Sequence, residues 1–124
     1  MKTLALIRHA KSSWDHPGVD DHDRPLNERG IRDAPRMAAR LAAEHPELRG
    51  AALLSSTALR AATTADAFAA ALDTTVRPDE RLYGATPRRI VELVSARSEG
   101  SVIVVAHDPG LSDLSRHWSR FPDD

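Results

Sequence analysis

The chain has 124 residues, of which 41% are hydrophobic and 28% are charged, which is the composition of an ordinary folded domain and not of a disordered chain. It contains no cysteine, which excludes disulfide bonds, cysteine-ligated zinc and cysteine nucleophiles. Its 17 basic and 18 acidic residues give a net charge of -1, which argues against a protein that coats nucleic acid.

The first predicted element is a short buried strand from Thr3 to Ile7. This apolar run is too short for the core of a signal peptide or for a membrane span, so we expect a cytoplasmic protein without a membrane partner. A loop from about His9 to Leu26 follows and is rich in Asp, His, Pro and Gly. A loop of this length in a small domain is usually functional.

The segment after Asn27 predicts the first helix. Asn27 is a suitable helix cap, and the buried apolar stripe is expected to consist of Ile31, Met37, Ala38 and Leu41. Pro35 lies inside this segment and removes one backbone hydrogen bond. We therefore expect a kink at Pro35 or a later start of the helix.

The middle of the chain predicts a strand, a helix and a weaker strand. Ala51 to Leu54 indicates the second strand, after which Ser56 or Thr57 would cap a helix from about Ala58 to Leu72. Thr75 to Arg77 indicates a weak third strand. These elements are short, and turn or cap residues lie between them.

The last third of the chain predicts a helix, a strand and a further helix. Thr86 followed by Pro87 is typical of a helix start, and the buried face of that helix is expected to consist of Ile90, Leu93 and Val94. Ser101 to Val105 is β-branched and uninterrupted, which predicts the fourth strand. A further helix is predicted from Leu111 to Trp118.

Strand and helix therefore alternate four times, which predicts a single α/β domain, residues 1–124, with a mainly parallel sheet covered by helices on both faces. Folds of this class bind ligands outside the carboxyl ends of their strands. The polar residues at these ends are, in chain order, Arg8 and His9; Ser55, Ser56 and Arg60; Asp79, Glu80 and Arg81; and His107 and Asp108.

This set of residues predicts an anion site. Two arginines and the amide groups at helix starts suit a phosphate group, because the guanidinium fork matches its oxygens. The positive charge keeps a histidine in the site neutral, and a neutral imidazole is a competent nucleophile towards phosphorus. We therefore expect phosphoryl transfer through a phosphohistidine intermediate, without metal or other cofactor, with the arginines stabilising the charge.

Five segments between Thr3 and Trp118 strengthen this interpretation: Arg8 to Ser13, Asp23 to Gly30, Ser55 to Ala65, Leu82 to Ala85 and Val104 to Gly110. Arg8-His9-Ala10 resembles the Arg-His-Gly motif of the histidine phosphatase superfamily. All five segments together resemble, in the same order, the small phosphohistidine phosphatases of the SixA type. The resemblance implies a three-layer, phosphoglycerate mutase-like sandwich in a minimal version without cap insertions.

The resemblance also implies roles for five residues. His9 is the expected nucleophile, Arg8 and Arg60 are expected to hold the phosphoryl oxygens, and His107 is expected to complete the pocket. Arg24 is expected to face the phosphate of the substrate, with a structural ion pair as the alternative. Relatives usually continue beyond the position of Asp124 into another strand, which this domain is expected to lack unless a tail is absent from the sequence.

Two further residues are candidates for the site. Glu80 follows the third strand and is expected to supply a proton to the leaving group. Lys11 is expected to add positive charge at the rim of the pocket, or else to be solvated. The Asp- and His-rich run from Trp14 to Asp23 could be read as a metal site, but its spacing matches no ligand pattern, and a solvated loop is favoured.

The leading hypothesis is a metal-independent phosphatase for phosphohistidine in a protein of the histidine phosphotransfer type. An open, shallow site without cap insertions would suit a phosphohistidine displayed on a protein surface. A phosphatase of small phosphate esters and a phosphate-binding module without turnover remain as alternatives. The sequence leaves the oligomeric state open, and no nucleic acid partner is expected.

Overall fold

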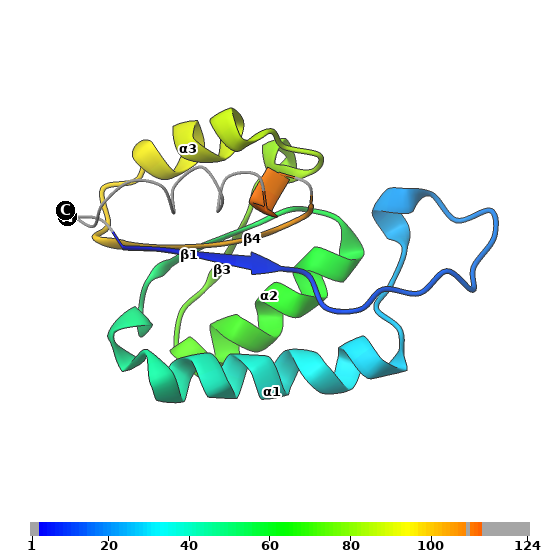
Figure 1. Cartoon of the computed structure of the whole chain (residues 1–124), viewed down its shortest axis with the longest axis horizontal. Helices are drawn as coiled ribbons and strands as arrows, with labels where there is room; N and C mark the ends of the chain where they lie inside the picture. Colours follow the sequence, from blue (N-terminus) through cyan, green and yellow to red (C-terminus); the bar gives the residue numbers. More distant parts are fainter. Residues whose placement is uncertain (1–2, 109, 113–124) are drawn as a thin grey trace.

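The computed structural model describes residues 3–108 and 110–112. In this part of the chain a parallel sheet of four strands, in the order β1-β4-β2-β3, forms the middle layer (Figure 1). The strands are β1, Thr3–Arg8; β2, Ala52–Ser55; β3, Val76–Pro78; and β4, Ser101–Ala106. All four strands run the same way, so their carboxyl ends meet at one edge of the sheet.

Helices cover both faces of the sheet. Helices α1, Glu28–Glu44, and α2, Leu59–Leu72, lie on one face, and α3, Pro87–Ser95, lies on the other (Figure 1). Three short 3-10 helices complete the described elements: η1, Asp21–Asp23; η2, Pro46–Leu48; and η3, Glu80–Leu82. The predicted α/β class, with a parallel sheet between two helical layers, is confirmed. No helix in the described ranges is both long and apolar enough to cross a membrane.

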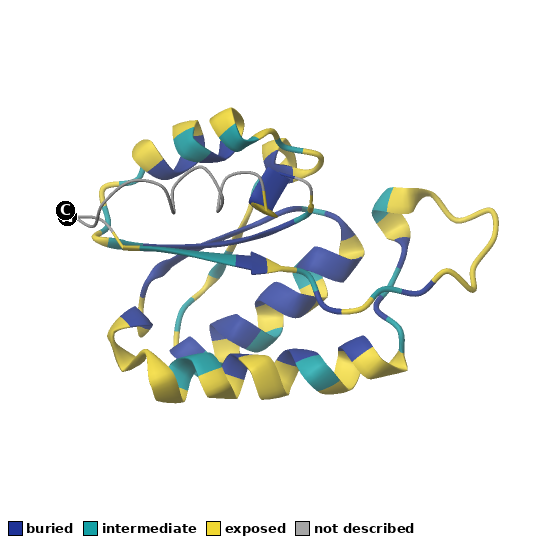
Figure 2. Cartoon of the chain, viewed as in Figure 1, coloured by how far each residue is buried: buried dark blue, intermediate teal, exposed yellow. Residues whose placement is uncertain are grey.

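Strand β4 divides the core into two halves because successive side chains of a strand point to opposite faces. Ile103 and Val105 pack in the core shared with α1 and α2, whereas Val102 and Val104 pack in the core shared with α3. All four side chains are fully buried (Figure 2). Burial on both faces explains why this strand reads as an uninterrupted apolar run.

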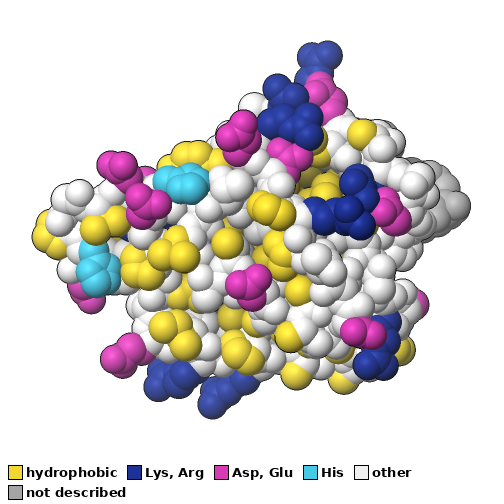
Figure 3. All heavy atoms as spheres, turned by 180° about the vertical axis from the view of Figure 1, so that it is seen from behind, with side chains coloured by type: hydrophobic (Ala, Val, Ile, Leu, Met, Phe, Trp, Pro, Cys, Tyr) yellow, Lys and Arg dark blue, Asp and Glu magenta, His cyan; other side chains and the backbone are white. Residues whose placement is uncertain are grey.

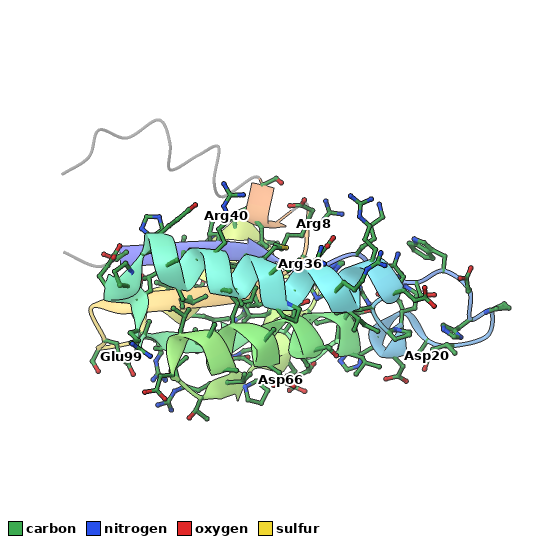
Figure 4. All side chains as sticks on the ribbon, turned by 90° about the horizontal axis from the view of Figure 1, so that it is seen from below. Arg8, Asp20, Arg36, Arg40, Asp66 and Glu99 are labelled. Atoms are coloured by element: carbon green, nitrogen blue, oxygen red, sulfur yellow. The ribbon has the colours of Figure 1, made fainter. Side chains whose placement is uncertain are left out.

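Helix α1 buries a different face from the one the sequence predicted. Ile31 and Met37 are 58% and 43% exposed, so the prediction that these two residues belong to the buried stripe is wrong. The buried residues are Gly30, Ala34 and Ala38, which repeat every fourth residue, with Leu41 partly buried beside them. Small side chains on this face let α1 lie close against α2 (Figure 4), whereas Ile31 and Met37 face solvent.

The start of α1 agrees with the predicted cap, because the Asn27 side chain accepts a hydrogen bond from the Gly30 backbone N–H at 2.8 Å. The helix begins at Glu28 and continues through Pro35, so the later start is wrong. The predicted cap of α2 is also wrong: Ala58 is the cap residue and makes no side-chain bond. The Ser56 hydroxyl bonds to His107 and accepts a hydrogen bond from the Ala58 backbone N–H at 3.2 Å, and the Thr57 hydroxyl bonds to His22.

Helix α3 begins as predicted, because the Thr86 hydroxyl accepts a hydrogen bond from the Arg89 backbone N–H. Its buried residues are the expected Ile90, Leu93 and Val94. The helix predicted from Leu111 to Trp118 and the question of a C-terminal strand fall almost entirely outside the described residues.

Gly30 is required where α1 starts against the loop that follows β1. A methyl group at this position would overlap the Lys11 carbonyl oxygen. We expect Gly30→Ala to lower the free energy of unfolding by about 1–3 kcal/mol, the usual cost of overpacking. Gly100→Ala is the matched control, because no heavy atom lies within 4 Å of the added methyl. Urea unfolding measures both, and equal midpoints for the two variants would contradict this account of Gly30.

Candidate active site

A cavity of about 640 Å³ lies at the carboxyl ends of β1 and β4. Its lining comes from the end of β1, the loop from residue 9 to residue 26, the first turn of α2, the end of η3 and the end of β4. The lining residues are Arg8, His9, Ala10, Lys11, Ser12, Trp14, Asp21, Arg24, Arg60, Tyr83, Gly84, His107 and Asp108. Of the residues to which the sequence analysis gave a role in the site, Glu80 is not among them; it is exposed at the start of η3. The strand-end residues Ser55, Ser56, Asp79 and Arg81 also lie outside this lining.

The loop from residue 9 to residue 26, here called the site loop, is fixed at its base and extended at its tip. An isolated bridge joins Ser12 to Leu26, and the Ser13 backbone N–H donates to the Pro25 carbonyl at 2.9 Å. The outer part of the loop projects from one end of the molecule (Figure 1). Seen from behind, acidic and histidine side chains gather on this projecting end (Figure 3). The fixed base places the first residues of the loop beside the cavity.

His9 and His107 face each other in the cavity, with their ring centroids 5.1 Å apart. His9 Nδ1 lies 2.8 Å from the Ala10 carbonyl oxygen. Because a carbonyl only accepts hydrogen bonds, Nδ1 donates the proton and Nε2 keeps its lone pair. The His107 ring is fixed by a hydrogen bond of 2.8 Å between Nε2 and the Ser56 hydroxyl.

Both imidazoles are held in the neutral form. Burial lowers the pKa of His9 below its ordinary value, and the charges of Arg60, Arg8 and Arg24 lower it further, against the hydrogen bond to Ala10. Burial and the Arg60 charge lower the pKa of His107 to about 4. Both rings are therefore uncharged at neutral pH, which leaves the unprotonated nitrogen of His9 able to attack an electrophile.

Thr64 connects the backbone next to His9 with the backbone of Arg60. Its hydroxyl accepts a hydrogen bond from the Ala10 N–H at 3.0 Å and donates one to the Arg60 carbonyl at 2.8 Å. The side chain is completely buried. The start of the site loop and the first turn of α2 are thus joined behind the cavity.

Arg60 is 5% exposed and reaches the cavity from α2. One terminal nitrogen donates to the Asp21 carboxylate at 2.9 Å, and the other donates to the Asp21 backbone carbonyl. Among the residues described, its Nε is buried without a hydrogen-bond partner. Arg60 therefore has donor capacity that Asp21 alone does not use.

Arg24 is 8% exposed and comes from the base of the site loop. Its Nε donates to Asp21 at 3.1 Å, and one terminal nitrogen donates to the Ser12 hydroxyl and the Ser13 carbonyl at 2.9 and 3.0 Å. The guanidinium carbon lies 3.6 Å from the centre of the Trp14 ring, a stacked cation–π arrangement. Arg24 thus makes the ion pair that the sequence left as an alternative and also lines the cavity.

Arg8 and Lys11 lie at the outer part of the cavity. Arg8 makes an ion pair with Asp108 at 3.4 Å and is largely exposed (Figure 4). Lys11 is exposed and is one of the lining residues. The lining thus carries four cationic side chains and two carboxylates. With neutral histidines, two positive charges remain, which suits a doubly charged anion.

The sequence analysis gave no role in the site to three residues that complete this arrangement: Asp21, Ser56 and Tyr83. The Tyr83 hydroxyl donates to Asp21 at 2.6 Å, and this bond, followed by the Arg60 and Arg24 bonds, holds the pKa of Asp21 well below its usual range. Ser56 lies at the end of a strand, but a serine at this position is equally typical of a cap for the helix that follows. The one local signal for Asp21 is its position three residues before Arg24.

In the described ranges, no three His, Asp or Glu side chains gather in a way that could hold a metal ion. Asp and His side chains of the site loop make hydrogen bonds and ion pairs with other residues. Asp21 bonds to Arg24, Arg60 and Tyr83, and His22 lies 2.8 Å from the Thr57 hydroxyl and 3.5 Å from Asp23.

Comparisons with known proteins identify the family. The model of the histidine phosphatase superfamily (branch 1) matches residues 4–84. An uncharacterized protein of Mycobacterium tuberculosis is 40% identical over 111 residues, which cover 88% of this chain and 67% of that protein. The chain is also similar to the structure of SixA from Agrobacterium tumefaciens, a candidate phosphohistidine phosphatase. That match has a TM-score of 0.85 and 32% identity, and it covers 94% of this chain and 77% of the other.

A third similar structure is the protein histidine phosphatase SixA in complex with tungstate, with a TM-score of 0.71 and 26% identity over 90% of this chain and 73% of the other. The chain belongs to the histidine phosphatase superfamily, branch 1. Within that superfamily it is a SixA-type protein, and it is therefore a phosphatase of the histidine phosphatase type. The predicted resemblance and the fold implied by it are confirmed.

Proposed function

We propose that this protein is a metal-independent phosphatase that removes the phosphoryl group from a phosphohistidine of a protein, through a phosphohistidine intermediate on His9. We also propose that residues 1–124 form one histidine phosphatase domain. The observation that carries the proposal is the state of His9: its ring is neutral, its Nε2 lone pair is free of the Ala10 bond, and it faces His107 among arginines.

The reaction proceeds in two displacements. In the first, the lone pair of His9 Nε2 attacks phosphorus and the P–N bond of the substrate breaks. The substrate imidazole, already protonated on its other ring nitrogen, keeps that proton and leaves as a neutral ring. In the second, water attacks phosphorus, the bond to His9 breaks, and inorganic phosphate leaves. Protonated imidazole is already a good leaving group, so a separate acid is less necessary than for an ester. A general-acid role for Glu80 stays a prediction.

The charged residues of the lining stabilise the transferring group. A phosphoryl group spreads negative charge over three oxygens in the transition state. Arg8, Arg24 and Arg60 offer guanidinium N–H donors from three different segments, and His107 offers a ring beside His9. Fixed positive donors around the phosphoryl group supply the stabilisation that a metal ion supplies in other phosphoryl-transfer enzymes.

The volume of the cavity favours a substrate larger than a phosphate ion. Its volume of about 640 Å³ exceeds the space that a single phosphoryl group fills, and it lies within the range of ordinary ligand pockets. An imidazole side chain carrying the phosphoryl group fits this space. The names of two similar structures, both SixA proteins, support the choice of phosphohistidine. The same volume also accommodates a small phosphate ester, which is the second candidate substrate.

A comparison of substrates tests the proposal. We expect a higher kcat/KM for a histidine phosphotransfer domain phosphorylated on histidine than for p-nitrophenyl phosphate or sugar phosphates. We also expect unchanged turnover in EDTA. Equal or faster turnover of the esters would favour the second candidate. A loss of activity in EDTA that a divalent metal restores would contradict the mechanism.

The titration of the two imidazoles gives a separate prediction. Because the pKa of His9 is lowered and that of His107 is about 4, both rings become charged only at a pH below their ordinary value of 6.5. The neutral nucleophile is then lost as the pH falls through the lowered pKa of His9, so the acid limb of kcat/KM lies below pH 6.5. NMR titration of the ring protons, assigned with His9→Ala and His107→Ala, measures both values. A midpoint above pH 6.5 for His9 would contradict the electrostatic account.

A further inference from the structure

Asp21 joins the two buried arginines of the cavity. Its carboxylate accepts a hydrogen bond from Arg24 Nε at 3.1 Å and one from an Arg60 terminal nitrogen at 2.9 Å. Its backbone carbonyl accepts from the other terminal nitrogen of Arg60. Asp21, a single residue of η1, therefore bonds to both terminal nitrogens of Arg60 and to Nε of Arg24.

A third contact fixes the carboxylate of Asp21 itself. The Tyr83 hydroxyl donates to it at 2.6 Å. Tyr83 directly follows the last residue of η3, and its ring lies edge-on to the rings of His107 and His22, with centroids 5.6 and 5.0 Å away. Three segments that are distant in sequence, the site loop, α2 and η3, thus meet at one carboxylate.

The contacts of Asp21 leave donors available on both arginines. Each terminal nitrogen of a guanidinium carries two N–H groups. Asp21 engages one group on each terminal nitrogen of Arg60, and the second group of each remains. Arg24 is held through Nε and one terminal nitrogen, so its other terminal nitrogen remains. Both arginines line the cavity while they are held in this way.

We propose that Asp21 is a positioning residue, which orients Arg24 and Arg60 so that their remaining N–H groups meet the phosphoryl oxygens. This inference rests on the proposed phosphate-binding role of the two arginines. Long arginine side chains lose rotational freedom when they bind an anion, and a partner that holds them beforehand removes that cost from the binding step.

The direction in which phosphate affinity changes when Asp21 is replaced tests whether Asp21 positions the arginines. Removing a carboxylate makes the cavity more positive, so Coulomb attraction alone predicts tighter binding of phosphate. If Asp21 positions the arginines, its removal weakens binding in spite of the added positive charge. The two accounts of Asp21, a positioning residue or a competing anion, therefore predict opposite changes.

We expect Asp21→Asn to weaken the binding of inorganic phosphate and orthovanadate by about 10-fold or more, because charge-assisted hydrogen bonds are lost. Titration calorimetry at fixed ionic strength measures the phosphate affinity, and inhibition measures that of vanadate. Asp20→Asn is the matched control: it removes the same charge one residue away, near the outer end of the site loop, from a side chain that makes no cap bond (Figure 4). It is expected to keep the affinity of the unmodified protein. Unchanged or tighter binding by Asp21→Asn overturns the inference.

Tyr83→Phe provides a second test that does not depend on the folding of Asp21→Asn. It removes the bond of 2.6 Å but keeps the ring of a residue that is 39% exposed. We expect weaker phosphate binding and a higher KM, with a smaller change in kcat, whereas unchanged phosphate affinity overturns the inference. If the unmodified protein itself binds no phosphate, the proposed function fails and the inference fails with it. If it binds phosphate and the variants bind it equally well, only the inference fails.

Discussion

Replacing His9 by alanine is expected to reduce turnover of a phosphohistidine protein by about 1000-fold or more, because the attacking group itself is removed. The arginines of the cavity remain in this variant, so the binding of orthovanadate is expected to change far less than kcat. Turnover assays and vanadate titration on the same preparation separate the two effects. A protein that loses kcat but keeps anion affinity has lost its nucleophile and not its fold.

His45→Ala is the matched control for His9→Ala. His45 directly follows the last residue of α1, is not among the residues that line the cavity, and its ring is paired with Glu47 on the surface. Its removal should leave turnover unchanged. Acid-labile and base-stable labelling of the unmodified protein by a phosphodonor, absent from His9→Ala, would identify the intermediate. If neither protein turns over substrate while both bind phosphate, the binding module without turnover becomes the better interpretation.

Replacing Arg60 by alanine is expected to lower kcat/KM by about 100- to 1000-fold, the usual loss when one group that stabilises developing charge is removed. Arg60→Lys should recover little of this loss. A lysine carries a single ammonium group. It cannot bond to both the carboxylate and the backbone carbonyl of Asp21 while it also faces the substrate. Steady-state kinetics of both variants, at a temperature where thermal unfolding shows that each is folded, measure the effect.

Arg40→Ala provides the comparison for the Arg60 variants. Arg40 lies on the outer side of α1, where it pairs with Glu44 and is largely exposed (Figure 4). The variant removes the same charge from the protein but none from the cavity, so its kcat/KM should equal that of the unmodified chain. Retention of most activity by Arg60→Ala would show that the remaining arginines suffice and would remove Arg60 from the mechanism.

Much of the cavity follows from the order of the elements. Parallel strands end at one edge, so Arg8, His9 and His107, which stand at strand ends, had to lie near each other, and Arg60 follows in the first turn of α2. Apolar runs and helix caps place the strands and α3 within a residue or two. These features depend on local spacing and on sheet geometry, which the sequence carries directly.

Features that depend on packing between distant segments were not predictable in the same way. The face that α1 buries is decided by how closely it approaches α2, which selects Gly30, Ala34 and Ala38 over larger apolar residues. Asp21 lies in a loop without periodicity, and its partners Arg60 and Tyr83 are 39 and 62 residues away in the chain. A single sequence contains no pattern that relates such positions.

The buried hydroxyl of Thr64 limits which side chains that position can tolerate. It receives one proton from Ala10 and gives its own to Arg60, so the position needs a group that both accepts and donates within one small volume. Serine meets this requirement, whereas valine, of nearly the same shape, would leave the buried Ala10 N–H without an acceptor. A substitution that breaks these bonds would therefore disturb the positions of His9 and Arg60 together, although Thr64 itself does not line the cavity.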